Sequence, residues 1–376
     1  MAKKIVNITD VCSEIFAGGD APKNKMSTQK TSEYTIPIYS NGEDADGLYG
    51  YTNFARVTLP SITVSARGTI GYTSIRNEPF VPIVRLITIT PIPKLISIRY
   101  LYYAVKNLSF TGSGTSIPQL TVPMVKQYNF PLPPLGEQRK IAAVLDKVSD
   151  LIAKRRQQLN KLDELVKSRF IEMFGDPKDN SNGWPVLPLG KLFTVSSSKR
   201  IYQSEQTSSG IPFLRISDLV QRMDERTVTA ELYISEQHYA ALKKEGLVPV
   251  AGDILVTSRG TLGRCYEIKE DDRFYFQDGM ISWLFDKKPM VTNTYIMQLF
   301  QMPGFRKQID DIPAGSTVNY LSLARLKELR VMCPTIELQE QFIAFVEQVD
   351  KSKLAVQQGL QELEILKKSL MQEYFE

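Results

Sequence analysis

Two long stretches of the chain carry apolar residues at heptad spacing and predict long α-helices. The first is 135–174, and no glycine or proline interrupts residues 137–174. Its apolar positions are Leu145, Val148, Ile152, Leu159 and Leu162. The second is 336–376, where an apolar residue falls at every seventh position: Phe342, Val349, Val356, Leu363 and Leu370. A forty-residue helix would span about 60 Å.

Helices with such stripes are poorly stable alone in water, so we expect the two to pack on each other, antiparallel, as a coiled coil. The alternative is that each helix covers only the globular domain beside it. Arg155 and Arg169 stand in the first stripe where Val356 and Leu370 stand in the second, so the helices are expected to splay or meet a partner there.

The rest of the chain reads as two mixed domains of short strands and helices. The expected strands of the first are 35–40, 56–64 and 80–90, separated by Gly and Pro turns, and 95–108 is expected to be a helix. We therefore divide the chain into a first mixed domain (1–134), a first helix (135–175), a second mixed domain (176–333) and a second helix (334–376).

The two halves repeat each other. Gln138 aligns with Gln339, an offset of 201 residues (339 − 138), and the same offset pairs Gly114 with Gly315 and Leu120 with Leu321. Within the mixed domains, 65–71 matches 257–263 at an offset of 192, and 36–38 matches 211–213 at 175. The changing offset indicates a shared scaffold with loops of different length. The fold class expected is α+β, with two mixed domains, two antiparallel coiled-coil helices and an internal pseudo-two-fold repeat.

Composition narrows the function classes. The net charge of +5 and pI near 8.8 permit binding to nucleic acid without demonstrating it. The three scattered cysteines, Cys12, Cys265 and Cys333, fit a reducing compartment and argue against a zinc site. We expect no signal peptide, because 1–14 is polar, and no membrane span, because charges and prolines break the apolar stretch 80–105.

Motifs for catalysis are missing from the sequence. The one histidine, His238, lies in an expected exposed helix (236–244), and no phosphate-loop, nucleophile-elbow or zinc-protease motif is present. Gly112 and Gly114 form too weak a pattern for dinucleotide binding. The pairs Asp271–Asp272 and Asp310–Asp311 are interpreted as solvated turns. We therefore expect no catalytic residues, no metal site and no cofactor bound to this chain.

Candidate nucleic-acid contacts occur at equivalent places in the two halves. Each half has an Arg-Gly-Thr turn after a β-type run, and an arginine fork exposed there could pair with guanine or with a phosphate. The alternative is a structural hairpin whose arginine is merely exposed. Basic loop residues are further candidates for phosphate contacts. The candidates are Lys23, Lys25, Arg67, Gly68, Thr69, Lys199, Arg200, Tyr202, Arg259, Gly260 and Thr261.

The order of these parts resembles the DNA-specificity subunit of a type I restriction–modification system. The resemblance rests on the helix entries 132–138 (Leu-Pro-Pro-Leu-Gly-Glu-Gln) and 339–342 (Gln-Glu-Gln-Phe), and on the helix end 174–177 (Phe-Gly-Asp-Pro). It implies two target-recognition domains, each reading half of a split site in double-stranded DNA, with the helices as spacer. It also implies two modification (methyltransferase) subunits and further restriction subunits as partners. S-adenosylmethionine, ATP and Mg²⁺ would be bound by those subunits, in a prokaryotic cytoplasm.

Two other functions stay open from the residues alone. A self-sufficient DNA-modifying enzyme, such as a fused methyltransferase, would need the cofactor and catalytic motifs that the sequence lacks. A purely tethering coiled-coil adaptor would not need duplicated globular domains. Tests of the purified protein for S-adenosylmethionine binding and for sequence-specific DNA binding would separate the three.

Overall fold

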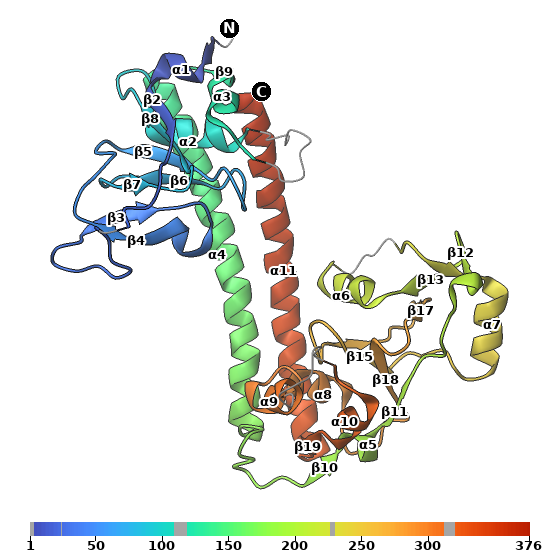
Figure 1. The fold of residues 1–376 in the computed structure, drawn as a ribbon. Helices are drawn as coiled ribbons and strands as arrows, with labels where there is room; N and C mark the ends of the chain where they lie inside the picture. Colours follow the sequence, from blue (N-terminus) through green and yellow to red (C-terminus); the bar gives the residue numbers. More distant parts are fainter. Residues whose placement is uncertain (1–3, 24, 109–118, 226–229, 312–319) are drawn as a thin grey trace. The chain divides into compact units, whose positions relative to one another are not determined.

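The computed structural model describes residues 4–23, 25–108, 119–225, 230–311 and 320–376 (Figure 1). The chain divides into two compact units. The first comprises Met1–Gln157 together with Val356–Glu376, and the second comprises Gln158–Ala355. Each unit therefore contains one mixed domain, one part of the first long helix and one part of the second.

The first unit is built on a four-stranded antiparallel sheet of order β2-β8-β5-β6. A three-stranded sheet, β4-β3-β7, contains one parallel pair, β3 with β7, and β1 pairs with β9. The strands are β1 (Ile5–Asn7), β2 (Cys12–Ala17), β3 (Ile36–Tyr39), β4 (Leu48–Thr52), β5 (Ser61–Val64), β6 (Thr73–Arg76), β7 (Val81–Pro82), β8 (Ile87–Pro91) and β9 (Asn129–Pro131). The helical segments are α1 (Ile8–Val11), η1 (Asp44–Gly47), α2 (Ile98–Lys106) and α3 (Val122–Lys126).

The second unit repeats this topology. Its four-stranded sheet has the order β11-β18-β15-β16, the sheet β12-β14-β13-β17 again contains one parallel pair (β13 with β17), and β10 pairs with β19. Its strands are β10 (Val186–Pro188), β11 (Thr194–Ser197), β12 (Gln206–Thr207), β13 (Ile211–Leu214), β14 (Tyr233–Ile234), β15 (Ile254–Thr257), β16 (Cys265–Glu267), β17 (Tyr275–Phe276), β18 (Ile281–Phe285) and β19 (Arg330–Met332). Its shorter helices are α5 (Leu189–Leu192), η2 (Gln203–Glu205), α6 (Ile216–Glu225), α7 (Glu236–Lys244), α8 (Asn293–Leu299), α9 (Pro303–Asp310) and α10 (Leu323–Glu328).

The expected repeat within the mixed domains is confirmed. Ile36 and Ile211 are the first residues of the equivalent strands β3 and β13. Strand β3 pairs in parallel with β7, and β13 pairs in parallel with β17. Helices α6 and α7 lie between β13 and β15, where the first unit has the short helical segment η1 and strand β4. The second copy therefore elaborates the shared scaffold between equivalent strands.

Four expected elements of the first mixed domain differ in extent from the structure, and one of them, the expected strand 35–40, is β3, shorter by one residue at each end. Only Ser61–Val64 of the run 56–64 is a strand, because Pro60 has no N–H to donate to a ladder. The run 80–90 is divided into β7 and β8 because Val84 and Arg85 take left-handed backbone conformations, with φ of 51° and 63°. The helix expected over 95–108 is α2, shorter at both ends.

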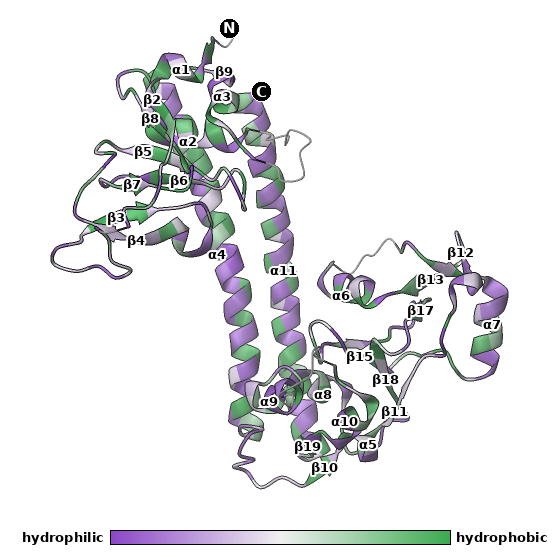
Figure 2. Ribbon diagram, in the orientation of Figure 1, coloured by the Kyte–Doolittle hydropathy of each residue, from purple (hydrophilic) through white to green (hydrophobic). Residues whose placement is uncertain are grey.

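The two long helices, α4 (Leu135–Phe174) and α11 (Ile336–Phe375), are 40 residues each and run antiparallel within each unit. In the first unit Arg156 of α4 pairs with Glu364 of α11 at 2.7 Å. In the second, Asp163 of α4 pairs with Lys353 of α11 at 2.6 Å. Gly175, with φ of 82°, follows the last turn of α4, as expected for a helix end. Figure 2 shows that hydrophilic residues dominate the middle of α4.

The expected stripe lies inward on both helices. Buried stripe residues are Leu145, Val148, Ile152, Phe342, Val349 and Val356. Partly buried ones are Leu159, Leu162, Leu363 and Leu370. At Arg169 the helices stay in contact, since its guanidinium lies 5.8 Å from the centre of the Phe345 ring on α11.

Each helix ends inside a mixed domain. In the first unit the Phe375 ring of α11 lies 5.0 Å from the Tyr100 ring of α2. In the second unit the Phe174 ring of α4 lies 5.0 Å from the Tyr295 ring of α8. The predicted packing of the two helices on each other is therefore confirmed, and the helices also pack on the mixed domains. The alternative, in which each helix covers only the domain beside it, is wrong. At each of these helix ends, a contact between two aromatic rings joins the helix to the hydrophobic core of the mixed domain.

Candidate nucleic-acid interface

The Arg-Gly-Thr turn of the first unit follows β5 directly and presents its arginine to solvent. The turn is held by hydrogen bonds from the Ser65 N–H to Tyr72 O and from the Gly71 N–H to Ser65 O, each 2.9 Å long. Gly68 has φ of 70°, and a Cβ there would meet nothing within 4 Å. The glycine thus serves backbone conformation and not close packing. Arg67 is exposed, and its Nη2 donates to Gln119 Oε1 at 2.9 Å.

The second unit has the same turn after β15. The Thr257 N–H donates to Arg264 O at 2.9 Å, and the Gly263 N–H donates to Thr257 O at 2.8 Å. Gly260 has φ of 64° and also has open space around it. Arg259 is exposed, and its guanidinium lies 5.3 Å from the centre of the Tyr320 ring. The sequence match at an offset of 192 therefore corresponds to one hydrogen-bonded turn used twice.

A surface hollow of about 510 Å³ adjoins the turn of the first unit. Its lining residues are Ser40, Asn41, Gly42, Glu43, Asp44, Arg67, Gly68, Thr69 and Val84. Asn41 connects three of its walls, because it accepts from the Ala66 N–H at 2.7 Å and donates to Val84 O at 2.6 Å. Val84 is half exposed and left-handed, a costly conformation for a β-branched residue. Arg67, Gly68 and Thr69 therefore line one hollow whose walls are joined by the hydrogen bonds of Asn41.

Asp46 holds the loop beside this hollow in place through its side-chain contacts. Its carboxylate accepts hydrogen bonds from Tyr72, Ser74 and Arg76, and the Arg76 guanidinium is buried against the Tyr39 ring, 3.7 Å from its centre. Burial acts to raise the pKa of Asp46, but the hydrogen bonds and the Arg76 charge outweigh it and lower the pKa overall. This network was not predictable from the sequence, since its members are distant along the chain.

The other predicted contacts are exposed and are not among the residues that line the hollow of the first unit. Lys23 and Lys25 lie in the loop after β2. In the second unit, Lys199 pairs with Glu245 at 3.3 Å and Arg200 pairs with Asp278 at 2.9 Å. The loop 278–280 connects the Arg200–Asp278 pair to the Arg-Gly-Thr turn of this unit, because Met280 O accepts from the Ser258 N–H at 2.8 Å. Tyr202 is 63% exposed, a large aromatic surface beside these cations.

One interpretation of the acidic pairs was wrong. The Asp272 side chain is only 2% exposed, and it accepts from Arg222 and Tyr266 in the interior of the second unit. An adjacent pair of aspartates gives no sign that one of them turns inward to a distant arginine. Asp310 is exposed and pairs with Arg306 at 2.9 Å, one helical turn away. Gly112, Gly114 and Gly315 lie outside the described residues.

Groups suited to nucleophilic or metal chemistry are not assembled in the part of the chain that the structure describes. Burial raises the pKa of the thiols of Cys12 (to about 12), Cys265 and Cys333, so none favours the reactive thiolate. His238 lies on α7 as expected, partly buried, 3.9 Å from Glu205. No cluster of three potential metal ligands occurs among the described side chains.

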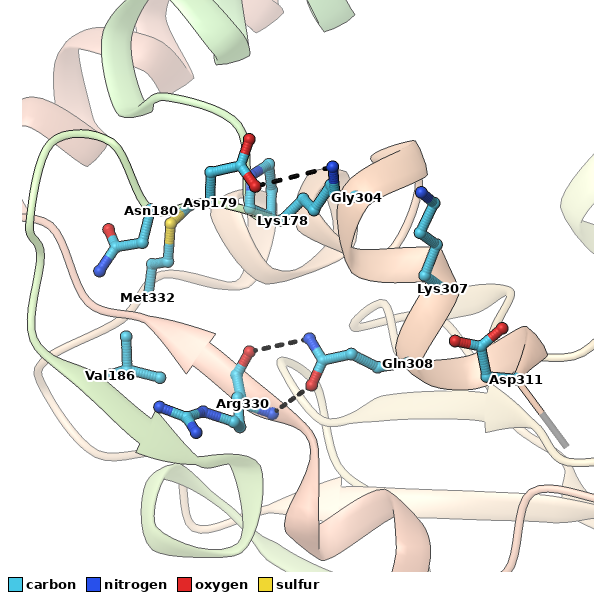
Figure 3. A pocket seen from close by; sticks show the side chains of 11 residues that line it. Lys178, Asp179, Asn180, Val186, Gly304, Lys307, Gln308, Asp311, Arg330 and Met332 are labelled. Carbon is cyan, nitrogen blue, oxygen red and sulfur yellow. Dashed lines mark hydrogen bonds and ion pairs between the residues drawn. The ribbon is translucent and has the colours of Figure 1, made fainter. Parts of the chain in front are cut away.

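A second hollow, of about 480 Å³, lies within the second unit between the segment after α4, helix α9 and strand β19 (Figure 3). Charges of both signs line it, including Lys307, Asp311 and Arg330. The Gln308 amide is already used on the Arg330 backbone, accepting from its N–H at 2.9 Å and donating to its carbonyl at 3.2 Å. Its lining holds no histidine, cysteine, serine or threonine.

Comparison with known families decides the identity. The model of the type I restriction modification DNA specificity domain matches residues 2–164 and 181–365. The chain belongs to this family. The two matched regions agree with the internal repeat, and the specificity-domain family accounts for a scaffold that occurs twice.

Specificity subunits are also found among the curated relatives. A Mycoplasma pneumoniae protein, provisionally named a type I specificity subunit, is 36% identical over 167 residues, which are 44% of this chain and 46% of that protein. A Haemophilus influenzae protein with a similar provisional name is 26% identical over 269 residues, 70% of this chain and 66% of that one. The chain thus spans less than half of the first of these relatives.

Solved structures of specificity subunits share the fold. The S subunit of a type I restriction–modification system from M. genitalium aligns with a TM-score of 0.52 and 17% identity, over 100% of this chain and 96% of that one. A chain from a study of type I complex assembly and conformational transition aligns with a TM-score of 0.57 and 16% identity, over 99% and 97%. Among the described helices, none is long and apolar enough to cross a membrane.

Proposed function

We propose that this specificity-domain protein is the DNA-reading subunit of a type I restriction–modification complex, and that each unit reads one half of a bipartite site. The observation that carries this proposal is the repeated turn, in which Arg67 and Arg259 are both exposed on the same hydrogen-bonded framework. An arginine fork on a rigid turn suits bidentate pairing with guanine O6 and N7 in the major groove. The self-sufficient enzyme is disfavoured, since the sequence lacks the cofactor and catalytic motifs that it would need.

The two half-sites differ in sequence. The scaffold is common, but the surroundings of the turn are not: the first unit has the hollow at Asn41, whereas the second has α6 and α7 as additional elements between β13 and β15. Base contacts depend on these surroundings, while phosphate contacts position the protein without reading sequence. Lys23, Lys25, Lys199 and Arg200 supply phosphate contacts, and Tyr202 packs against sugar or base.

The long helices set the gap and dock two modification subunits, one for each copy of the repeat. Leu165 of α4 and Leu366 of α11 occupy equivalent positions, at the offset of 201 (366 − 165), and are 47% and 45% exposed. A large apolar residue held in solvent at the same place in both copies suits one kind of partner bound twice. Methyl transfer, and the cofactor S-adenosylmethionine, belong to those partners; ATP and Mg²⁺ belong to the restriction subunits.

Mapping of methylated adenines in DNA treated with the reconstituted complex tests the proposal. We expect an asymmetric site of two short specific parts, with a non-specific gap near one helical turn of DNA, about 10 base pairs. Footprinting of the same complex should show protection over both parts. A continuous target, or a strictly palindromic one, contradicts the proposal, because two different readers on one scaffold cannot produce it.

A further inference from the structure

A second position of the repeat contacts each exposed arginine. Gln119 and Tyr320 stand at the offset of 201 (320 − 119), and each precedes a leucine whose N–H anchors the segment to the turn. Leu120 donates to Ala66 O at 3.0 Å in the first unit, and Leu321 donates to Ser258 O at 3.0 Å in the second. The backbone therefore delivers a different side chain to the same place beside Arg67 and Arg259.

The two side chains hold their arginines by different chemistry. Gln119 accepts one hydrogen bond from Arg67 through Oε1, and its amide N–H₂ remains as two further donors. Tyr320 offers its ring face to Arg259, an arrangement within the range of a cation–π contact. Stacking uses the face of the guanidinium and leaves its in-plane N–H groups available. Neither of these two contacts is a salt bridge.

We propose that the residue at this repeat position, Gln119 in the first unit and Tyr320 in the second, positions the arginine and thereby determines which bases each half-site accepts. This inference rests on the proposed reading of DNA by the two turns. In the first unit the arginine fork and the adjoining amide form one continuous row of donors. Such a row selects guanine together with a neighbouring base that presents an acceptor, such as thymine O4 or a second guanine. In the second unit the stacked fork reads a single guanine.

The test uses the complex with its modification subunits and duplexes randomised within each half-site, with base preference and affinity scored separately. Gln119→Leu keeps the size and removes the amide, so we expect preference at one or two adjacent base pairs of the first half-site to fall about tenfold. Gln119→Glu should abolish that preference, since the carboxylate pairs with the Arg67 fork and supplies no donors. Neither variant should change the second half-site.

Matched variants in the second unit separate ring from hydroxyl. Tyr320→Phe retains the stacking face and should leave base preference unchanged, whereas Tyr320→Leu should reduce the guanine preference of the second half-site about tenfold. Unchanged melting temperatures show that the variants fold. A uniform loss of binding on every duplex overturns the positioning role, because such a loss reports phosphate contact or altered structure.

The positioning role of Gln119 and Tyr320 can be refuted while the proposed reading of DNA by the arginines still stands. If Arg67→Ala alters the first half-site while Gln119→Leu and Gln119→Glu both leave its base preference unchanged, the positioning role is refuted and the reading arginine stands. If Arg67→Ala and Arg259→Ala leave binding unchanged on all duplexes, reading by the two turns is refuted, and this inference falls with it.

Discussion

Gln138 and Gln339 make the same three hydrogen bonds in the two units. Each Oε1 accepts a backbone N–H just before a short helix, from Ser97 and from Thr292, at 2.8 Å in both cases. Each Nε2 donates to two backbone carbonyls, one of them that of the proline five residues earlier, at 2.8 and 2.9 Å. Both side chains are buried. One glutamine thus joins the start of each long helix to its mixed domain.

Replacement of either glutamine by alanine should strongly destabilise its own unit. The change removes three hydrogen bonds at Gln138 and four at Gln339, whose Oε1 also accepts from the Thr292 hydroxyl at 3.2 Å. It leaves a buried N–H and two carbonyls without partners, which costs roughly 2–4 kcal/mol. Chemical unfolding of Gln138→Ala and Gln339→Ala measures this loss. Gln357→Ala, on an exposed face of α11, is the control and should cost under about 0.5 kcal/mol. Equal stabilities of all three variants would contradict the structural role.

Replacement of Arg67 or Arg259 by alanine should weaken DNA binding by about 1–3 kcal/mol and relax specificity in one half-site only. Binding of the complex to cognate and half-site-scrambled duplexes, titrated with salt, measures both effects. If the arginines touch phosphates instead, affinity falls for all sequences and the salt dependence becomes shallower. Lys94→Ala removes an exposed charge from the first unit outside the turn and should preserve specificity. Unchanged affinity on every duplex would end the idea.

Leu165→Asp and Leu366→Asp should each release one modification subunit from the complex. A charge at an exposed apolar contact leaves an unpaired, desolvated carboxylate if the partner stays bound. Native mass spectrometry of the reconstituted complex gives the stoichiometry, which we expect to change from two modification subunits to one. Ile365→Glu is the control, because the equivalent position of α4 is Glu164. Retention of both subunits in both Asp variants would refute docking at these leucines.

Because of Asp46, the free energy of unfolding of the first unit should decrease at low pH. The pKa of Asp46 in the folded protein lies below the ordinary value of about 3.9, so its stabilisation is complete above that pH and is lost as pH falls through the folded pKa. Asp46→Asn should cost about 2 kcal/mol at neutral pH, less than a fully buried pair would, since half of the Asp46 side chain is exposed.

Unfolding of the wild type and of Asp46→Asn at a series of pH values measures this difference. We expect the two curves to converge below about pH 4, where the wild-type carboxylate takes up a proton. Asp44→Asn, in the same loop but exposed, should follow the wild type. A penalty for Asp46→Asn that stays constant down to pH 2 would contradict the electrostatic origin.

The architecture was largely predictable because it depends on patterns local in the sequence. Heptad spacing and the helix end at Gly175 predicted the bounds of α4. The repeated motifs around Gln138 and Arg67 identified equivalent positions in the two halves from the sequence alone. Exposure of Arg67 and Arg259 also followed from the turn itself. DNA contact by these residues stays a prediction.

Contacts between distant residues were not predictable. Nothing in the sequence indicates that Gln119 reaches Arg67, or that Asp46 holds Arg76, because each pair depends on how separate strands and loops are placed in space. Asp272 shows the same limit, since its burial follows from Arg222 on α6 and not from the aspartate beside it. Specific side-chain pairs of this kind form the candidate site.

The Phe375–Tyr100 contact bears on the order in which the protein can form during synthesis. The second unit is continuous, and all of Gln158–Ala355 is available as soon as it has been translated. The first unit, although its mixed domain is made first, lacks the face supplied by Val356–Glu376 until that segment appears. The half made earlier is therefore completed last, and until then the side of Tyr100 that Phe375 covers stays exposed to solvent.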